Sequence, residues 1–313
     1  MSIFELKRAF SEGKLSKQEF INNMHNNHLI INDYAQYIKT TEIKKIIIEN
    51  GKVFMISDDD IIFRCNFFDK ANVPLINLSI GEYEKIEKKF LINSEADTKV
   101  LNDGEIIFDI GANYGFYSLN IANKYPNSKI YAFEPIKYTF DILCENISIN
   151  NLNNIIPYNF GFGKENTVAI FNFNQDNSGS TSMINILERD DSEKIECPIY
   201  TLDSFVKKNN INKIDFIKCD VEGAEFFVFQ GGKNILEKYI PIIFAEMLRK
   251  WSAKFGYHPN DIIMYMKNFG YSCFEFCNNK LKKFEIMTND TISTNFLFLH
   301  NYKHSLLIKS LSQ

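Results

Sequence analysis

The sequence predicts an α/β fold with a doubly wound, mostly parallel sheet, and three observations lead to this prediction. From residue 105 onward, strand-like apolar runs alternate with segments whose apolar residues recur at helical spacing. The run "KIDFIKCD" has the apolar residues Phe216 and Ile217 at consecutive positions, with Ile214 and Cys219 on either side, as expected for a strand that is buried on both faces. Nine of the fourteen glycines fall between Gly104 and Gly232, where tight turns must join strands to helices. Alternating β and α units imply a parallel sheet with helices on both sides.

Residues 1–80 have a different pattern and are predicted to form an N-terminal helical and β-hairpin extension. Ser16 and Glu19 have the spacing of a capping box, which predicts a helix within the first forty residues. Two β-rich runs then flank Asn50-Gly51 in "EIKKIIIENGKVFMISDDDIIFRCNF". An Asn-Gly dipeptide between such runs is the strongest short-range signal for a hairpin. We predict that the main domain covers residues 81–313.

Within residues 81–313, the order of elements follows from the same patterns. "EYEKIEKKFLI" is helical, "EIIFDI" is the first strand of the alternating region, and a helix is expected over 116–124. The next strands are "KIYAFEP", "NIIPYNFGFG", "KIDFIKCD" and "PIIFAEM". Helices are expected over 138–150, in "EGAEFFVFQGGKNILEKY" and over 260–269. The tail "YSCFEF", "NNKLKKFEI" and "TNFLFLH" predicts further strands with an Asn-Asn turn.

Composition excludes several classes of protein. The net charge is −4 and the lysines are scattered, so the sequence lacks the basic stripe of proteins that track nucleic acid. There is no run of about 18 apolar residues that would predict a membrane span. The start lacks the features of a secretory signal, and the six cysteines show no CxxC pair, which favours buried thiols. We therefore expect a cytoplasmic protein with no nucleic-acid partner.

The turn after the first strand of the alternating region has the features of a ligand loop. Asp109 closes the strand, and Gly111 and Gly115 follow at a spacing of four. Glycines let the backbone approach a ligand closely, and the helix N-terminus behind them presents free N–H groups. The G-x-G-x-x-G fingerprint of dinucleotide sites is absent. The loop suits a ligand that carries a positive group and a carboxylate, and S-adenosylmethionine is such a ligand.

Two later strand ends extend the predicted cofactor site. Glu134 ends the second strand of this region, where a carboxylate can accept both ribose hydroxyls, and Pro135 stiffens the turn behind it. An acid in contact with solvent at a strand end is the alternative for Glu134. Asn159 and Phe160 are placed to flank an adenine ring, although an ordinary turn would also explain them.

The ordered motifs "FDIGANYGFYS", "YAFEP", "YTLDSF", "IDFIKCDVEGAEFFVFQGG" and "IPIIFAE" resemble those of the FkbM family of S-adenosylmethionine-dependent methyltransferases, over roughly residues 80 to 275. The resemblance implies a class I methyltransferase (Rossmann-like) fold with a seven-stranded sheet. It also implies O-methylation of a hydroxyl group, and we expect a sugar acceptor, either a nucleotide-activated sugar or a surface-glycan precursor. By the matching motif, cofactor roles fall to Asp109, Gly111, Asn113, Gly115 and Glu134.

An alcohol needs help to lose its proton, so a base or a metal ion is expected near the acceptor. Asp220 ends the fourth strand over the predicted pocket and is the preferred base or metal ligand; a polar contact to the cofactor is the alternative. Glu222 is expected to begin the next helix and is a further catalytic candidate that could contact the substrate or a metal ion; an acid that offsets the helix dipole, with no catalytic role, is the alternative. Glu246 ends the fifth strand and could join a carboxylate cluster or pair with Arg249 or Lys250.

His258 is the one histidine in a loop on the expected ligand face, where it could act as a base or could simply pack beside Pro259. If a divalent metal is bound, the sequence predicts Asp220, Glu246 and His258 as its ligands. The segment "NSGSTSM" could be a lid or a plain turn.

Three other functions remain open from the sequence. The first is a nicotinamide-dependent oxidoreductase, which the glycine spacing disfavours, and the second is a nucleic-acid methyltransferase, which the charge disfavours. The third is a module that binds the cofactor without turnover. Association into a homo-oligomer is a further possibility.

Overall fold

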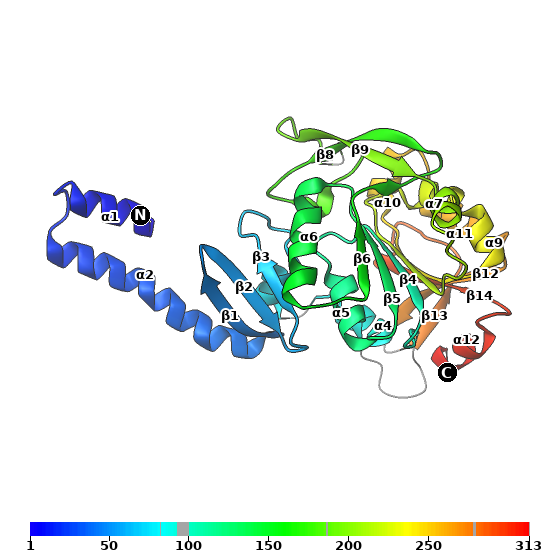
Figure 1. The fold of residues 1–313 in the computed structure, drawn as a ribbon, viewed down its shortest axis with the longest axis horizontal. Helices are drawn as coiled ribbons and strands as arrows, with labels where there is room; N and C mark the ends of the chain where they lie inside the picture. Colours follow the sequence, from blue (N-terminus) through cyan, green and yellow to red (C-terminus); the bar gives the residue numbers. More distant parts are fainter. Residues whose placement is uncertain (82, 93–99, 186, 278–279, 313) are drawn as a thin grey trace.

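A computed structural model of the chain describes residues 1–81, 83–92, 100–185, 187–277 and 280–312, and its centre is one large mixed sheet (Figure 1). The strand order is β13-β12-β14-β11-β10-β4-β5-β6. Strands β11, β10, β4, β5 and β6 are parallel, whereas β14, β12 and β13 pair antiparallel. The bounds are β4 (Ile106–Ile110), β5 (Lys129–Phe133), β6 (Ile155–Tyr158), β10 (Phe216–Cys219), β11 (Ile242–Glu246), β12 (Tyr271–Cys277), β13 (Lys280–Phe284) and β14 (Asn295–His300).

The sheet has eight strands in the described residues, not the seven that were predicted. The edge strand β13, which pairs with β12, corresponds to the strand predicted in "NNKLKKFEI". The Asn-Asn turn predicted at residues 278–279 lies outside the described residues.

Helices cover both faces of the sheet, which makes it doubly wound. One apolar cluster joins the sheet to α4 (Lys85–Leu91), α5 (Phe116–Lys124), α6 (Lys137–Ile149) and α12 (Ser305–Leu311). A second cluster joins the other face to α7 (Leu202–Lys208), α8 (Glu225–Gln230), α9 (Lys233–Lys238) and α11 (Pro259–Lys267). In β10, Phe216 packs in the first cluster and Ile217 in the second, which explains why these strands are apolar at consecutive positions.

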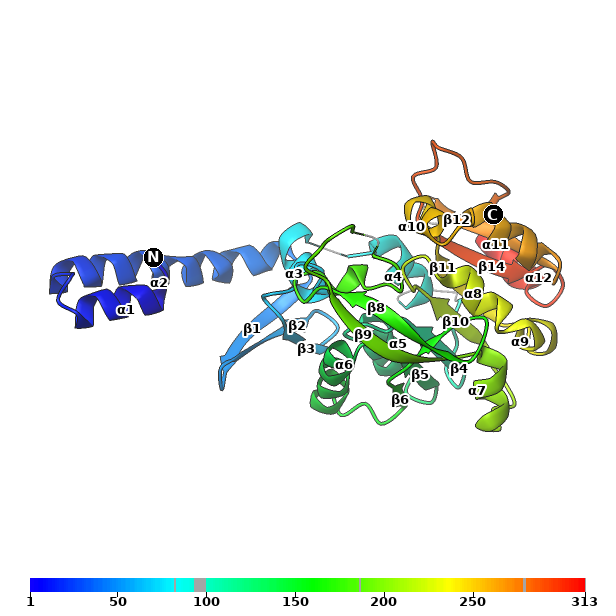
Figure 2. The same cartoon turned by 90° about the horizontal axis from the view of Figure 1, so that it is seen from above.

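The N-terminal part consists of a helical arm and a small antiparallel sheet. The arm is α1 (Ile3–Ser11) and α2 (Lys17–Tyr37), and it projects away from the rest of the molecule in both views (Figures 1 and 2). The capping box predicted at Ser16 and Glu19 begins α2 as expected, yet none of the residues of α2 is buried. A short 3-10 turn, η1 (Ile38–Thr40), leads into β1 (Ile43–Glu49), β2 (Lys52–Ser57) and β3 (Ile62–Cys65), and α3 (Val73–Ile80) follows.

The predicted hairpin is confirmed, because β1 and β2 pair antiparallel around Asn50 and Gly51, both of which have positive φ. The boundary near residue 80 stays a prediction.

A second small sheet, β7-β9-β8, lies above the carboxyl end of the central sheet (Figure 1). Its strands are β7 (Gly161–Phe162), β8 (Thr167–Phe173) and β9 (Glu193–Tyr200), and the turn η2 (Ser178–Ser180) lies in the connection from β8 to β9. The segment predicted as one helix after "KIDFIKCD" is two helices, α8 and α9, because the chain breaks at Gly231 and Gly232. The remaining helix, α10 (Arg249–Lys254), follows β11.

The expectation of buried thiols holds for four of the six cysteines, whereas Cys144 is half-buried and Cys277 is exposed. The six cysteines are free, and Cys65, Cys197, Cys219 and Cys273 are buried. Among the helices that the structure describes, none is long and apolar enough to cross a membrane.

Candidate active site

The carboxyl ends of β4, β5, β10 and β11 open into one pocket, a cavity of about 320 Å³. Of the residues predicted from the sequence, those that line it are Gly111, Asn113, Glu134, Pro135, Asp220, Glu222 and Glu246. Parallel strands end at the same edge of a sheet, so strand-end residues far apart in sequence meet here.

The loop between β4 and α5 is held by hydrogen bonds from Ser118 of α5 to Asp109 at the end of β4. This buried carboxylate accepts hydrogen bonds through Oδ2 from the backbone N–H of Ser118, at 3.1 Å, and from its hydroxyl, at 2.6 Å. Asp109 is not among the residues that line the pocket, so it orders the start of α5 and does not itself face the cavity.

Two glycines in the loop are required by their surroundings. Gly111 has φ +78°, and a Cβ there would lie 1.8 Å from the carbonyl oxygen of Asp220. Gly115 has φ +93°, and a Cβ there would lie 2.6 Å from Leu143 Cδ1. The loop therefore packs directly against the chain that follows β10, and neither position accepts a side chain.

Glu134 is buried at the end of β5, with both carboxylate oxygens held by backbone donors. Oε2 accepts the N–H of Asn113 at 3.0 Å, and Oε1 accepts the N–H of Ile136 at 3.0 Å. Burial raises the pKa of Glu134 to about 7, although these N–H groups act against the shift. When the group is ionised, each oxygen keeps a free lone pair and can accept a further hydrogen bond from a hydroxyl group.

Asn159 and Phe160 do not line the pocket. The amide nitrogen of Asn159 donates to the carbonyl oxygens of Glu134 and Pro135, both at 2.9 Å, so it supports the chain behind Glu134. Phe160 packs in an aromatic cluster with Phe133 and Phe205. These two residues therefore contact residues of the cavity lining from behind, without lining the cavity themselves.

Lys218 is a central residue that the sequence reasoning did not identify. It is buried, and its Nζ donates to the carbonyl oxygen of Gly111 at 2.9 Å. The same Nζ lies 3.1 Å from Asp220 Oδ2 and 3.6 Å from Asp109 Oδ1. Burial acts to lower the pKa of Lys218, but the carboxylates of Asp220 and Asp109 outweigh it and raise the pKa above its usual value. A lysine inside an otherwise apolar strand was the signal that could have identified it.

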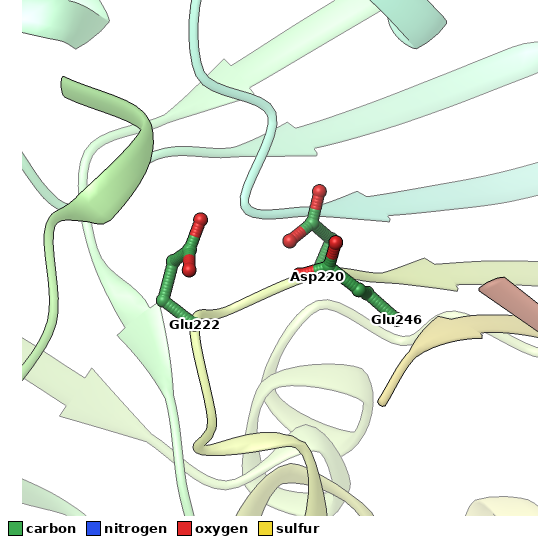
Figure 3. A group of neighbouring side chains, drawn as sticks. All are labelled: Asp220, Glu222 and Glu246. Carbon is green, nitrogen blue, oxygen red and sulfur yellow. The ribbon is translucent and has the colours of Figure 1, made fainter. Parts of the chain in front are cut away.

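Three carboxylates gather beyond β10 and β11 (Figure 3). Each of Asp220, Glu222 and Glu246 offers one oxygen, and the three oxygens lie within 4.8 Å of one another. Burial and the nearby charge of Asp220 raise the pKa values of Glu222 and Glu246 well above their usual range. Like charges held this close favour binding of a proton, a cation or a hydrogen-bond donor.

The structure removes the alternatives for two of these acids. The prediction that Glu222 begins a helix is wrong. It lies in a turn with φ 53°, three residues before α8 begins. A role in offsetting a helix dipole therefore does not explain it. Glu246 is not paired with Arg249 or Lys250, because the Arg249 guanidinium donates to carbonyl oxygens of residues 288–291 and Lys250 lies over the Trp251 ring.

His258 is not brought together with Asp220 and Glu246. It is exposed at the N-cap of α11, where its Nδ1 accepts the N–H of Asn260 at 3.2 Å and its own N–H donates to Asp261 at 2.8 Å. The predicted set of metal ligands is thus replaced in the structure by a cluster that contains Glu222 in place of His258.

Comparisons with known proteins identify a family and several relatives. The model of a family described as "Methyltransferase FkbM domain" matches residues 109–273. The chain is 26% identical over 167 residues to Methyltransferase 1 of Beauveria bassiana, a match that covers 48% of this chain and 67% of the relative. It is 27% identical over 137 residues to hexuronic acid methyltransferase AglP of Haloferax volcanii, which covers 43% of this chain and 53% of the relative.

Among solved structures, a methyltransferase FkbM from Methylobacillus flagellatus is similar, with 14% identity and a TM-score of 0.44. The match covers 67% of this chain and 47% of that chain, so the present chain spans about half of that structure.

Proposed function

The chain belongs to the FkbM family of methyltransferases, and from that premise we propose that it transfers a methyl group from S-adenosylmethionine to a hydroxyl group of a sugar. The observation that supports this best is the placement of Glu134 and Asp220 in one pocket on either side of the β4–α5 loop. Glu134, which would bind the cofactor, and Asp220, which would accept the proton of the acceptor hydroxyl, then face the same cavity.

The residues of the pocket fit the proposed cofactor. Gly111 lines the cavity, and Glu134 presents two oxygens that suit the vicinal hydroxyls of a ribose. S-adenosylmethionine, when bound, supplies a methyl group on a positively charged sulfur. The carboxylates at the strand ends favour a positive charge in this cavity.

Asp220 is the residue that we propose as the base for the acceptor hydroxyl. Lys218 holds Asp220 at 3.1 Å and so fixes the carboxylate at the end of β10. Glu222 and Glu246 then remain to accept hydrogen bonds from neighbouring hydroxyls of the acceptor. Holding the acceptor next to the methyl donor in attack geometry can contribute about 7–11 kcal/mol to the lowering of the barrier.

The proposal of a sugar acceptor has two sources of support. Several carboxylates around one cavity suit a ligand with several hydroxyls, and one relative is named a hexuronic acid methyltransferase. The proposal covers two forms of the acceptor, a nucleotide-activated sugar and a precursor of a surface glycan.

A divalent cation is a second way to activate the hydroxyl. Asp220, Glu222 and Glu246 offer oxygen ligands, the type that Mg²⁺, Mn²⁺ and Ca²⁺ prefer. Such a cation would supply Lewis-acid activation, and the three side chains would then act as ligands instead of Asp220 acting as the base.

The test is a methyl-transfer assay with labelled S-adenosylmethionine and a panel of sugar acceptors, with and without a chelator. We expect Asp220→Asn to keep cofactor affinity within a few-fold but to lower turnover by about 10² or more. Asp33→Asn, on the exposed face of the arm, is the matched control. Unchanged turnover in Asp220→Asn would remove this residue from the mechanism.

The same protein distinguishes the remaining alternatives. Thermal stabilisation by a nicotinamide cofactor and not by S-adenosylmethionine would favour an oxidoreductase. Stabilisation by S-adenosylmethionine without transfer to any acceptor would favour a binding module.

A further inference from the structure

Part of the pocket is built by residues that precede the family match at 109–273. The segment of residues 66–76 runs from the end of β3 into α3, and Ala71, Val73, Pro74 and Ile76 line the cavity. None of these four side chains carries a polar atom. We call the side chains of Ala71, Val73, Pro74 and Ile76 the apolar wall; Asn72, between them, is buried and does not line the cavity.

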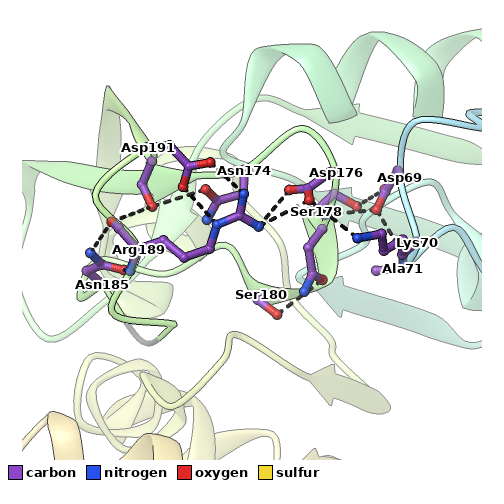
Figure 4. A network of polar contacts seen from close by, with 12 residues as sticks. Asp69, Lys70, Ala71, Asn174, Asp176, Ser178, Ser180, Asn185, Arg189 and Asp191 are labelled. Atoms are coloured by element: carbon purple, nitrogen blue, oxygen red, sulfur yellow. Dashed lines mark hydrogen bonds and ion pairs between the residues drawn. The ribbon is translucent and has the colours of Figure 1, made fainter.

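A buried carboxylate holds this segment in place (Figure 4). Asp69 is fully buried, and its Oδ1 accepts the N–H of Ser178 at 3.1 Å and the N–H of Ala71 at 2.9 Å. Its Oδ2 accepts the hydroxyls of Ser178 and, at 2.7 Å, of Tyr114. All four donors thus converge on one side chain, which is the arrangement that makes a buried carboxylate a rigid anchor.

The anchor joins three segments that line the same cavity. Ser178 belongs to the "NSGSTSM" segment, which also lines the pocket, and Tyr114 follows the loop glycine Gly111. Asn113 of that loop donates from Nδ2 to the Ser178 hydroxyl at 3.4 Å. Ser178 lies in the connection from β8 to β9, and Arg189 of this connection pairs with Asp176 at 2.8 Å (Figure 4). The apolar wall is therefore fixed relative to the cofactor loop.

The charged residues of the pocket indicate which charge of an acceptor is disfavoured. Glu134, Asp220, Glu222 and Glu246 line the cavity, and among the described lining residues Lys218 is the only one with a cationic side chain. Lys218 is already engaged by Gly111, Asp220 and Asp109. A phosphate or a second carboxylate in this cavity would lie near the charge of Asp220 and would find no free cation to pair with among the described lining residues.

We propose that residues 71–76 are the acceptor-recognition element of this enzyme, and that the acceptor is a glycoside without negative charge that presents an apolar edge, such as the methyl group of a deoxy sugar, to the apolar wall. This inference rests on the proposed function, because it takes the same pocket to bind a sugar. It selects between the two forms of acceptor, since a nucleotide-activated sugar would bring a diphosphate.

The test measures acceptor binding separately from turnover. The full-length protein is saturated with S-adenosylhomocysteine, and the affinities of four types of compound are measured by calorimetry: methyl 6-deoxyhexosides, methyl hexosides, methyl hexuronides and nucleoside diphosphate hexoses. The first two differ only by a hydroxyl at one carbon, and the third adds a charge at that carbon. We expect a matched deoxyhexoside to bind about tenfold more tightly than its hexoside, and more tightly still than the hexuronide or the nucleotide sugar.

Two variants test the wall itself. Val73→Thr keeps the side-chain shape and adds a hydroxyl, so it should reduce the preference for the deoxyhexoside to about threefold or less. Ile76→Lys adds a cation, so it should improve hexuronide binding about tenfold relative to the deoxyhexoside. Ile80→Lys, on the exposed side of the same helix at 66% exposure, is the control and should leave both ratios unchanged. Affinity for S-adenosylhomocysteine checks that each variant is folded.

The outcomes separate this inference from the proposed function. Binding of the deoxyhexoside with the expected selectivity but without methyl transfer supports the proposed role of the apolar wall in acceptor recognition and contradicts the proposed function. Methyl transfer to a hexuronide or nucleotide sugar in preference to neutral acceptors supports the function and overturns the inference. The inference is also overturned if no neutral glycoside binds to protein that has bound S-adenosylhomocysteine, or if Val73→Thr and Ile76→Lys behave like Ile80→Lys.

Discussion

Cofactor affinity is expected to depend on pH through Glu134. Burial raises the pKa of this carboxyl to about 7 in the free protein. Only the ionised group can accept a hydrogen bond from each ribose hydroxyl while its other lone pairs take the N–H groups of Asn113 and Ile136. Cofactor binding therefore selects the carboxylate and, by linkage, should lower its pKa.

The size of the effect follows from that pKa. With a pKa of about 7, roughly one molecule in eleven carries the carboxylate at pH 6 and roughly ten in eleven carry it at pH 8. The dissociation constant should therefore rise about tenfold between pH 8 and pH 6, equivalent to about 1.4 kcal/mol. In the free protein, the stability of the fold depends on pH in the opposite direction. The raised pKa of Glu134 increases the free energy of unfolding below the ordinary pKa near 4.5, and this contribution is lost as the pH rises through about 7.

The assay is calorimetric titration of S-adenosylhomocysteine between pH 5.5 and 8.5. Glu134→Gln is the matched control, because it keeps the shape but offers only one acceptor oxygen and cannot ionise. We expect this variant to bind more weakly at pH 8, by about 1.5–3 kcal/mol for lost charged hydrogen bonds, and to show no dependence on pH in this range. An equal slope in the wild type and in Glu134→Gln would refute the reasoning.

Four further outcomes are expected. Gly111→Ala should abolish cofactor binding in a thermal-shift titration, because its Cβ would overlap the carbonyl oxygen of Asp220 at 1.8 Å; retained binding would show that the loop can move. Asp69→Asn should raise the acceptor KM about tenfold or more with a smaller change in kcat, because an amide cannot accept all four hydrogen bonds of the anchor. If the Asp220 cluster binds a divalent cation, chelation should abolish turnover and added Mn²⁺ should restore it, whereas full activity after chelation leaves Asp220 as the base. Removal of residues 1–33 should leave the rate of methyl transfer within about twofold, because α2 has no buried residue. The same truncation should reduce any oligomer seen by light scattering to a monomer, because the exposed Ile30 and Ile31 are lost.

The sequence was most informative where function depends on strand ends. Glu134, Asp220 and Glu246 each close an apolar run, and a parallel sheet brings such ends to one edge whatever their separation along the chain. The loop glycines were identifiable for a related reason, since few residues other than glycine adopt the backbone conformation of such a turn.

The parts that could not be predicted depend on contacts between distant segments. Asp69 accepts hydrogen bonds from residues 45 and 109 positions away, and nothing in the local sequence "FFDKANV" indicates either partner. His258 was misplaced because loop composition does not fix the direction of a side chain, and this histidine is used as a helix cap. Glu222 was assigned to a helix because the turn that precedes α8 has no proline or paired glycine to mark it.

The contact between Gly111 and the chain at Asp220 has a consequence for how the two ligands would cooperate. The loop that would hold the methyl donor and the strand end that would receive the acceptor touch backbone to backbone, and Lys218 ties them together from beneath. Because of these contacts, we expect binding at one half to affect binding at the other. Thermodynamic reciprocity then requires that the factor by which the bound donor changes the affinity for the acceptor equals the factor by which the acceptor changes the affinity for the donor.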